Sequence, residues 1–381
     1  MRKGWEYKKL GEVCTLISDG SHNPPKGIDH SLYRMISSQN VFDDNLQITE
    51  DNVRYITEKD HLCENKRTKL QKDVVLLTIV GTIGRSCVLN GNEGCLTLQR
   101  SVAALHPSDQ IMPRYLMHCL IGNRHTLNQE AHGIAQKGIY LKQLSSLSIP
   151  LPPISTQLSI VSELDKINEL IRLKKELLKD FDNLAQSLFY EMFGDPLENE
   201  RGWEVKKISN IAKYHNGVAH EQDIDKDGDF VLINAKFISS EGQIKKYTSI
   251  QRFPLFKNDI VMVLSDLPNG KSLAKCFLID EDNKYTLNQR ICCFRGFDGS
   301  SIYLKNIINR NPYLLSFDNG KGQTNLRKGD VEKIPIPLPP LPLQNLFAQR
   351  IEQIEHQKAE VQKSITDLET LLASRMQYWF E

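Results

Sequence analysis

The sequence contains no long hydrophobic segment. Nowhere do about 18 apolar residues follow one another, which excludes a membrane-spanning helix of ordinary length. The opening residues, Met1 to Glu6, lack the apolar stretch of a secretory signal, and we therefore expect the protein to be cytoplasmic. Its 8 cysteines include no Cys-x-x-Cys pair, so we expect reduced thiols and neither disulfides nor zinc ligands.

An excess of charge of either sign is also missing. The 48 basic residues are balanced by 47 acidic ones, which leaves a net charge of +1. This balance disfavours a protein that coats nucleic acid. It is compatible with a local basic groove, because phosphate binding needs only a patch of positive charge. With 381 residues, the chain is long enough for two or three domains with cores of their own.

Residue patterns typical of catalysis are absent as well. The 10 histidines do not recur at metal-ligand spacing, and we find no nuclease or Ser/His/Asp pattern. Asn23-Pro24-Pro25-Lys26 has lysine where an amino-methyltransferase motif needs an aromatic residue, so we interpret it as a turn. Residues 265–272 resemble a phosphate-binding loop, but Ser265 replaces its first glycine and the matching residues 84–86 have no lysine. The sequence therefore predicts no metal site and no nucleotide site, and it disfavours a free-standing enzyme.

What the sequence does contain is an internal repeat. Ile-Pro-Leu-Pro-Pro stands at residues 149–153 and again 187 positions later, at residues 336–340. Gly-Trp-Glu, near Gly4, returns at Gly202. Apolar segments typical of β-strands occur at residues 73–80 and 259–264.

Shorter matches lie between these landmarks. We expect Gly84-Arg85 to correspond to Gly270-Lys271, and Gln99-Arg100 to Gln289-Arg290. Gly133 and Gln136 in a glycine-rich loop match Gly320 and Gln323. The repeat predicts a mixed α/β unit used twice, with a long helix after each copy.

The segment after each proline motif has the period of a coiled-coil helix. Apolar residues recur at alternating steps of three and four, and each series is interrupted by a lysine, Lys174 or Lys358. The first helix is expected to end at Gly194-Asp195-Pro196. The residues predicted to pair the helices are Leu164, Ile167, Ile171, Leu178, Phe181, Leu188, Ile351, Ile354, Val361, Ile365, Leu368 and Leu372.

The proline motif itself predicts a stiff, extended joint. Proline cannot continue a strand or sit inside a helix, so we expect each motif to separate a globular part from its helix. We interpret the joint as a device that fixes the orientation of the globular part.

The loops of the two globular parts carry side chains that are able to bind DNA. Arginine and lysine can contact guanine, asparagine and glutamine can contact adenine, and lysine also binds phosphate. A single such residue is more often a solvated loop position, so the prediction rests on the group as a whole. The candidates are Ser21, His22, Asn23, Lys26, Arg85, Arg124, Asn128, Lys137, Lys271, Lys321, Gln323, Arg327 and Lys328.

Taken together, these features resemble the specificity (S) subunit of type I DNA restriction–modification systems. The resemblance rests on two variable globular parts that each end in Ile-Pro-Leu-Pro-Pro before a long helix, with Gln157 or Gln344 four residues past the motif. The Gly-Thr-Ile-Gly-Arg turn at residues 81–85 also resembles that family. The second copy departs from the usual glycine loop, because Asp266 and Pro268 stand within it.

The resemblance implies a mixed α/β fold with two target recognition domains, at residues 1–150 and 196–337. Two conserved spacer helices, at residues 151–195 and 338–381, would pair antiparallel. Each recognition domain would read one half of a bipartite, asymmetric site in double-stranded DNA. The helices would dock two methyltransferase (M) subunits, and restriction (R) subunits would join them. The chain itself would catalyse nothing and bind no cofactor, because S-adenosylmethionine, ATP and Mg²⁺ are expected on the partner subunits.

Two other interpretations stay open at this point. The chain can equally be the S-type subunit of a type IIB-like enzyme, in which one partner both cuts and methylates. The near-neutral charge also permits a coiled-coil scaffold whose globular parts bind proteins and not DNA.

Overall fold

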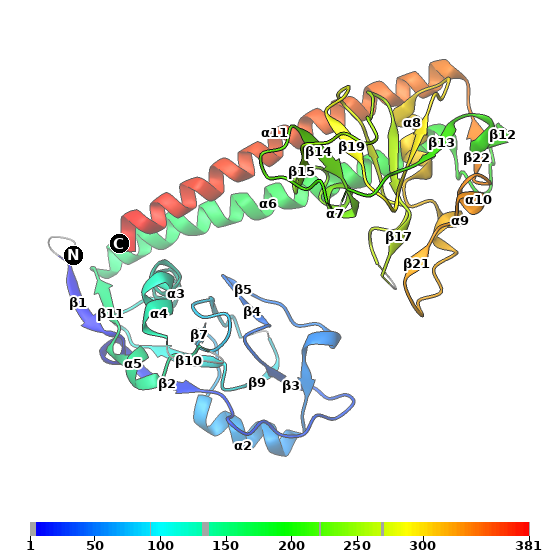
Figure 1. Ribbon diagram of the computed structural model, residues 1–381. Coiled ribbons are helices and arrows are strands. Elements are labelled where there is room, and N and C mark those ends of the chain that lie inside the picture. The colour runs from blue at the N-terminus through cyan, green and yellow to red at the C-terminus, as the bar shows by residue number, and fades with distance from the viewer. Residues whose placement is uncertain (1–4, 92, 132–136, 221, 268–269, 381) are drawn as a thin grey trace. The chain divides into compact units, whose positions relative to one another are not determined.

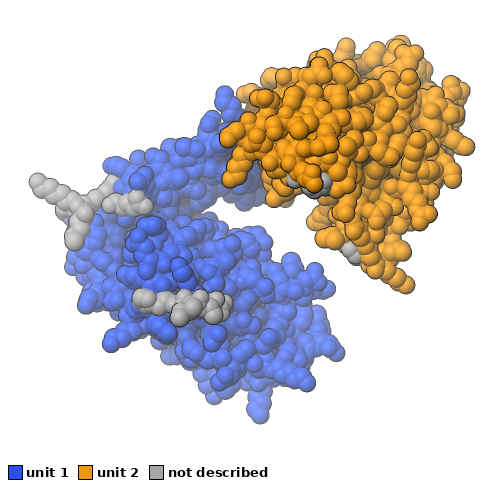
Figure 2. Space-filling model, in the orientation of Figure 1, with its two compact units in different colours: residues 1–176, 362–381 blue, residues 177–361 orange. Residues whose placement is uncertain are grey.

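The computed structural model describes residues 5–91, 93–131, 137–220, 222–267 and 270–380. Its contacts divide the chain into two compact units (Figure 2): residues 1–176 with 362–381, and residues 177–361. Each unit consists of a globular head and parts of the two long helices. We call the globular parts head 1, up to residue 151, and head 2, residues 203–338. The four-part division proposed from the sequence stays a prediction, since each unit takes residues from both long helices.

Head 1 is built around a four-stranded antiparallel sheet in the order β2-β10-β7-β8. Figure 1 labels three of these strands, β2, β10 and β7. A smaller sheet, β6-β3-β9, lies over it, and a core of buried residues such as Leu76, Leu98 and Ala104 fills the space between. The other face of the large sheet packs against α3 through Leu77, Tyr115 and Leu120, among others. The elements of head 1 are β1 (Glu6–Lys9), α1 (Leu10–Val13), β2 (Cys14–Asp19), β3 (Tyr33–Ile36), β4 (Val41–Phe42), β5 (Asn45–Leu46), a 3-10 turn (Glu50–Asn52), β6 (Arg54–Tyr55), α2 (Glu58–Thr68), β7 (Val75–Thr78), β8 (Ser86–Val88), β9 (Cys95–Leu98), β10 (Val102–Pro107), α3 (Pro113–Gly122), α4 (Arg124–Glu130), α5 (Leu141–Ser146) and β11 (Ser148–Leu151).

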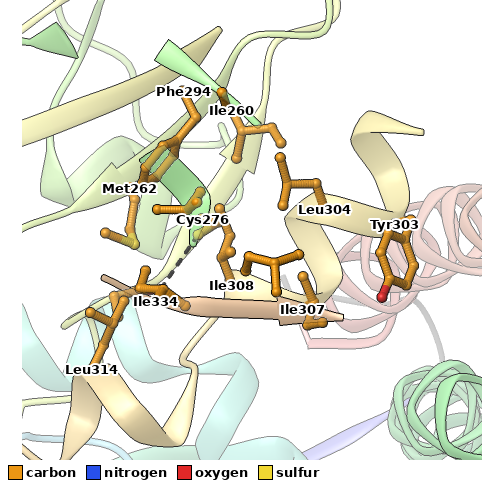
Figure 3. Close-up of a cluster of buried hydrophobic side chains, with 14 of the residues drawn as sticks. Ile260, Met262, Cys276, Phe294, Tyr303, Leu304, Ile307, Ile308, Leu314 and Ile334 are labelled. Atoms are coloured by element: carbon orange, nitrogen blue, oxygen red, sulfur yellow. Dashed lines mark hydrogen bonds between the residues drawn. The ribbon is translucent and has the colours of Figure 1, made fainter. Parts of the chain in front are cut away.

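Head 2 repeats this plan with the sheets β13-β20-β16-β18 and β15-β14-β19. Figure 3 shows one face of the larger sheet, where Met262, Cys276 and Phe294 pack on Leu304 and Ile308 of α8. The elements of head 2 are β12 (Glu204–Lys207), a 3-10 turn (Ile208–Asn210), β13 (Lys213–Asn216), β14 (Phe230–Ile233), α7 (Ala235–Ser239), β15 (Tyr247–Thr248), β16 (Ile260–Val263), β17 (Ser265–Asp266), β18 (Cys276–Leu278), β19 (Tyr285–Leu287), β20 (Ile291–Arg295), α8 (Ser301–Ile308), α9 (Pro312–Leu315), β21 (Thr324–Asn325), α10 (Lys328–Val331) and β22 (Pro335–Leu338). The predicted fold class, two mixed α/β heads and two long helices, is confirmed.

The long helices are α6 (Ile154–Phe193) and α11 (Leu341–Phe380), and they run antiparallel within each unit. In unit 1, Arg375 pairs with Glu163, and Lys175 donates to Glu369 at 2.7 Å. In unit 2, Lys358 Nζ lies 2.7 Å from Asp182. The partner residue on α11 therefore moves backward as the chain advances along α6.

Burial along the helices follows a period of three and four. Between residues 171 and 187, α6 is exposed except at Ile171, Lys174, Leu178, Phe181 and Ala185. Between residues 351 and 363, α11 is exposed except at the positions 351, 354, 358 and 361. The alternating steps of three and four that mark the sequence are thus also the spacing of the less exposed side of each helix.

The proline motif corrects one expectation, because its first residues do form a strand. Residues 148–151 pair antiparallel with β1, with Pro150 opposite Tyr7, and Pro337 of β22 lies opposite Val205 of β12. Proline is tolerated here because each ribbon has only two strands, so the side of the proline that lacks an N–H need not pair. The motif closes each head by joining its end to its beginning, and the helix starts only after the last proline.

The carbonyl groups of these prolines are bound by buried side chains in the same way in both heads. Tyr115 Oη donates to the Pro150 carbonyl at 2.9 Å, and Tyr303 Oη donates to the Pro337 carbonyl at 2.7 Å. Gln157 Nε2 donates to Pro152 at 2.9 Å, and Gln344 Nε2 donates to Pro339 at 2.8 Å. The joint is therefore held by a tyrosine of the head and a glutamine of the helix, of which the sequence pattern had pointed only to the glutamine.

The structure also corrects the register of the repeat inside the heads. Thr78 N donates to the Arg85 carbonyl in head 1, and Val263 N donates to the Lys275 carbonyl in head 2. Gly84-Arg85 therefore corresponds to Ala274-Lys275 and not to Gly270-Lys271, because the loop of head 2 is longer. Gln99 likewise matches Asn288, since both follow a strand and donate to the neighbouring strands β3 and β14.

Candidate nucleic-acid interface

Several loops of head 1 leave its large sheet at the same edge. Strands β2 and β7 end there and strands β10 and β8 begin there, as the pairs Asp19↔Ala103, Thr78↔Val102 and Leu77↔Ser86 show. Residues 20–27, 79–85 and 99–101 follow directly, and Gly138 joins them through a bridge to Val80. We call this edge, with its loops, the loop end of head 1.

Head 2 has the same edge, defined by the pairs Asn216↔Cys292, Val263↔Ile291 and Met262↔Cys276. Residues 217–220, 222–229, 264–267, 270–275 and 288–290 lie next to these strand ends. Strand β21 pairs with β17, which brings the glycine-rich loop at residues 316–328 to the same edge. The topology therefore gathers the predicted DNA-binding loops of each head at one place, which no linear pattern had indicated.

Both loop ends depend on a glycine where two backbone segments touch. A Cβ on Gly20 would lie 2.1 Å from the Leu98 carbonyl oxygen, and one on Gly217 would lie 1.9 Å from that of Asn288. No side chain fits at either position. Glycine at these two positions therefore lets the first loop of each head pass directly beside the turn that precedes β10 in head 1 or β20 in head 2.

The candidates in the first loop of head 1 lie in different environments. Ser21 is buried, and its backbone N–H donates to the Leu98 carbonyl. The His22 side chain is 56% exposed, and its Nε2 lies 2.7 Å from the buried carboxylate of Asp19. Asn23 and Lys26 are exposed. This loop therefore offers three exposed polar side chains, and Ser21 is not one of them.

The remaining candidates of head 1 surround the loop at residues 79–85. The Arg85 guanidinium lies 4.7 Å from the centre of the Phe42 ring. Arg124 donates to the Gly84 carbonyl at 3.1 Å and pairs with Asp43, and Asn128 donates to the Arg124 carbonyl at 2.8 Å. Lys137 is exposed in the loop that pairs with Val80. Arginine and lysine are thus concentrated beside one turn.

In head 2, candidates line a shallow hollow of about 520 Å³. Gln323 Nε2 donates to Ser265 Oγ at 2.6 Å, which fixes the glutamine across the β17–β21 ribbon. Lys321 and Arg327 also line the hollow, together with the aromatic ring of Phe317. Lys328 follows directly and lies 5.5 Å from the Tyr214 ring. The hollow combines cationic, amide and aromatic groups, the types that bind nucleic acid.

The turn that resembles a phosphate-binding loop is filled by the protein's own carboxylate. Asp266 Oδ2 accepts from the N–H groups of Ser272 at 2.7 Å and Leu273 at 3.1 Å, and Asp266 Oδ1 accepts from Leu267 at 2.8 Å. These amides are therefore not available to a nucleotide phosphate. Lys271 is exposed, and its carbonyl accepts from Arg310 at 2.5 Å.

Sequence reasoning missed Lys275, the true counterpart of Arg85. Its Nζ donates to the Ser239 carbonyl at 3.0 Å and lies 3.4 Å from Glu241. It also missed Asp19 and Arg67, whose ion pair backs the His22 ring. Only the length of the second loop, visible when the strands are placed in register, identifies Lys275.

Other kinds of site find no support in the part of the chain that the structure describes. There, no group of three or more His, Cys, Asp or Glu residues is placed to hold a metal ion. All eight cysteines are free, and burial raises the pKa of the Cys119 thiol to about 12. Within the described ranges, no helix is both long and apolar enough to cross a membrane.

Comparisons with known proteins agree on one family. A family model described as "Type I restriction modification DNA specificity domain" matches residues 2–180 and again residues 200–370. The type I restriction enzyme EcoBI specificity subunit of Escherichia coli is 27% identical over 161 residues, which are 40% of this chain and 33% of that protein. The putative type I restriction enzyme MjaX specificity subunit of Methanocaldococcus jannaschii is 21% identical over 388 residues, which cover 92% of this chain and 87% of that protein. The alignment with the EcoBI subunit thus spans about a third of its length.

Solved structures share the fold. A type I restriction–modification S subunit from M. genitalium aligns over 99% of this chain and 96% of its own, with 13% identity and a TM-score of 0.54. A chain from a study of "complex assembly and conformational transition of the type I R-M system" aligns over 100% and 98%, with 15% identity and a TM-score of 0.57.

Proposed function

The chain belongs to the family of type I restriction–modification DNA specificity domains, and we propose that each of its heads reads one half of a bipartite DNA site. The observation that carries this proposal is the loop end. In both heads the same sheet edge collects exposed cationic and amide side chains, although the loops themselves differ in sequence. A shared frame with different reading loops suits a site whose two halves differ.

The loop ends also suggest how the DNA is held. Lys26, Lys137, Lys271, Lys321 and Lys328 are exposed long cations that suit the sugar–phosphate backbone. Gln323 and Arg327 line a hollow and suit base edges. The division between backbone and base contacts predicts that lysine substitutions weaken all DNA binding, whereas substitutions in the hollow change the sequence preference.

We further propose that the antiparallel helices act as a spacer and dock two methyltransferase (M) subunits, which restriction (R) subunits then join. Each long helix has 40 residues and so a length of about 60 Å. One turn of DNA is about 34 Å long, which such a helix exceeds. In this proposal the chain binds no cofactor, and S-adenosylmethionine, ATP and Mg²⁺ belong to the partner subunits.

The decisive experiment is co-expression with the M subunit followed by mapping of methylated adenines across a genome. A bipartite, asymmetric motif is the expected result. The absence of methylation from an assembled complex would contradict the proposal. Purification then counts the partners: separate M and R polypeptides favour a type I complex, and one partner that cuts and methylates indicates a type IIB-like enzyme.

The spacer is tested by removing one heptad from both helices. This shortens the pair by about 10 Å, so the preferred gap between half-sites should shrink by roughly 3 base pairs, or binding should be lost. An unchanged gap with full activity would contradict the spacer. A gel shift on random DNA at low salt separates a DNA-binding protein from a scaffold, because a scaffold shows no salt-dependent shift.

A further inference from the structure

Arg290 has a backbone conformation that its side chain disfavours. It lies at the loop end of head 2, directly before β20, with φ at 66°. A non-glycine residue in this left-handed region is strained, and glycine or asparagine adopts it more readily. In head 1 the equivalent residue is Ser101, which has no positive φ. The strain is therefore a property of head 2 and not of the fold.

The surroundings force this conformation on residue 290. The Arg290 carbonyl accepts from Leu264 N at 2.9 Å, and Asn288 N donates to Ile233 at 3.1 Å. The Asn288 carbonyl is also in contact with Gly217, where no Cβ fits. The turn is thus fixed by three neighbouring segments, which is the condition under which strained residues persist.

The side chain of Arg290 has no internal task among the described residues. It is exposed, and its guanidinium forms no ion pair or hydrogen bond with any residue that the structure places. Arg310, the other arginine with a positive φ, differs, because its guanidinium donates to the Lys271 carbonyl. Packing inside head 2 therefore explains Arg310 and leaves Arg290 unexplained.

We propose that Arg290 is a specificity-determining residue that reads a guanine in the half-site bound by head 2. The inference rests on the proposed DNA-binding function and adds a residue outside the group that the sequence had indicated. A rigid backbone aims the planar guanidinium, and two parallel N–H groups match O6 and N7 of guanine in the major groove. A phosphate contact needs no such aim, because a flexible lysine serves it equally well.

The test uses the full chain with its M subunit and the site found by methylation mapping. The Arg290→Asn variant should bind the cognate site about 10- to 100-fold more weakly than the wild type does. It should no longer distinguish the cognate site from a site in which one particular G·C pair has been replaced. The loss should be confined to the half-site of head 2. At the same time the unfolding midpoint should not fall, because asparagine tolerates a positive φ.

Two controls match the substitution. Asn283→Gly changes another residue of unit 2 with a positive φ, beyond the opposite end of β18, and should leave DNA binding unchanged. Arg350→Gln removes an exposed arginine from α11 and should not alter base discrimination. Arg290→Lys keeps the charge but not the planar pair of N–H groups, so it should discriminate less sharply than the wild type while the salt dependence of binding stays the same.

Two results would overturn the inference. One is unchanged discrimination in Arg290→Asn. The other is an equal loss on every DNA sequence with a salt dependence reduced by about one ion, which would assign Arg290 to a phosphate. Failure of the proposed function looks different, since the wild-type complex itself would then show no sequence-dependent methylation or binding.

Discussion

Head 1 and head 2 contact the long helices through different side chains, which lie beside the same buried hydrogen bonds. In unit 1, Arg114 donates to both oxygens of Asp165 on α6, at 2.6 and 2.7 Å, and to Asp44 at 2.9 Å. His118 Nε2 lies 2.7 Å from the same Asp165. Head 1 is therefore held against α6 by a network of ion pairs around Asp165.

The equivalent positions of unit 2 carry no such network. Ile302 stands in place of Arg114 and packs against the core, and Asn306 binds the Ile302 carbonyl at 2.8 Å. Glu352 stands in place of Asp165 and is exposed. Here aromatic rings connect head and helix, with Phe193 of α6 4.8 Å from Tyr303. The hydrogen bonds to the proline carbonyls are shared because the backbone needs them, whereas the neighbouring side chains are free to differ.

The largest contrast should come from the two phenylalanines that meet the buried tyrosines. Phe193 is 3% exposed and contacts Tyr303, whereas Phe380 is half-buried beside Tyr115. We expect Phe193→Ala to destabilise unit 2 by about 3–5 kcal/mol and Phe380→Ala to destabilise unit 1 by less. Hydrogen exchange read separately over the two units measures both effects, and equal losses would show that the aromatic contact is no stronger in unit 2.

The shared hydrogen bonds should respond alike in the two heads. Gln157 and Gln344 are buried, so leucine at either position leaves proline carbonyls and a backbone N–H without partners. We expect Gln157→Leu and Gln344→Leu each to cost about 1–3 kcal/mol in their own unit. Gln357→Leu, at an exposed site of α11, is the control. A loss in one unit only would contradict a common joint.

The stability of unit 1, and not that of unit 2, should depend on the ion pairs around Asp165 and should therefore fall in acid. Burial raises the pKa of Asp165, but hydrogen bonds from His118 and Arg114 outweigh it, so the net pKa lies below the ordinary 3.8. The carboxylate therefore stabilises unit 1 above that value, and this contribution is lost as the pH falls through the lowered pKa. Asp165→Asn should cost about 1 kcal/mol at neutral pH and progressively less in acid.

Urea unfolding of the wild type and the variant between pH 3 and pH 7 measures this effect. Glu352→Gln, the matched change in unit 2, should have no comparable consequence. If the difference in unfolding free energy between wild type and Asp165→Asn does not shrink in acid, the carboxylate charge does not stabilise the contact between head 1 and α6.

The smallest effect is expected at Lys174 and Lys358, the lysines that interrupt the apolar series of the long helices. Lys358 lies 2.7 Å from Asp182 and 3.3 Å from Glu355, and burial lowers its pKa less than these carboxylates raise it. Lys174 is also half-buried, but no ion pair forms there with the described residues. We expect Lys358→Met to change stability by less than about 1 kcal/mol, since methionine replaces a desolvated ion pair with apolar packing, and Lys174→Met to be stabilising. Thermal unfolding of both variants decides the order.

Much of this architecture could be predicted because it is periodic. From Leu164 to Leu188, apolar residues recur at steps of three and four, so each helical turn adds further evidence for the same helix. The heads follow no such rule, and there the matched positions were off by one residue or more. A longer loop before β18 moved the partner of Arg85 from Lys271 to Lys275, and sequence alone gives no measure of where an insertion falls.

The candidate interface was predictable as a set of residue types and not as a place. Arg85 and Lys137 are far apart in the sequence and reach the same loop end only because Gly138 bridges to Val80, just after β7. The equivalence of Tyr115 and Tyr303 was not predicted, because it depends on hydrogen bonds to the Pro150 and Pro337 carbonyls that only the folded chain brings into reach.

The way the long helices are shared between the units has a consequence for the order of folding during synthesis. Unit 2 is continuous, from residue 177 to residue 361, so all its parts are synthesised before residues 362–381 are added. Unit 1 needs residues 362–381 from the far end of the chain. Leu372, Met376, Trp379 and Phe380 cover its core, which stays incomplete until then. Head 1 precedes unit 2 in the chain but is completed only by residues 362–381, so its apolar surface stays open while unit 2 is synthesised.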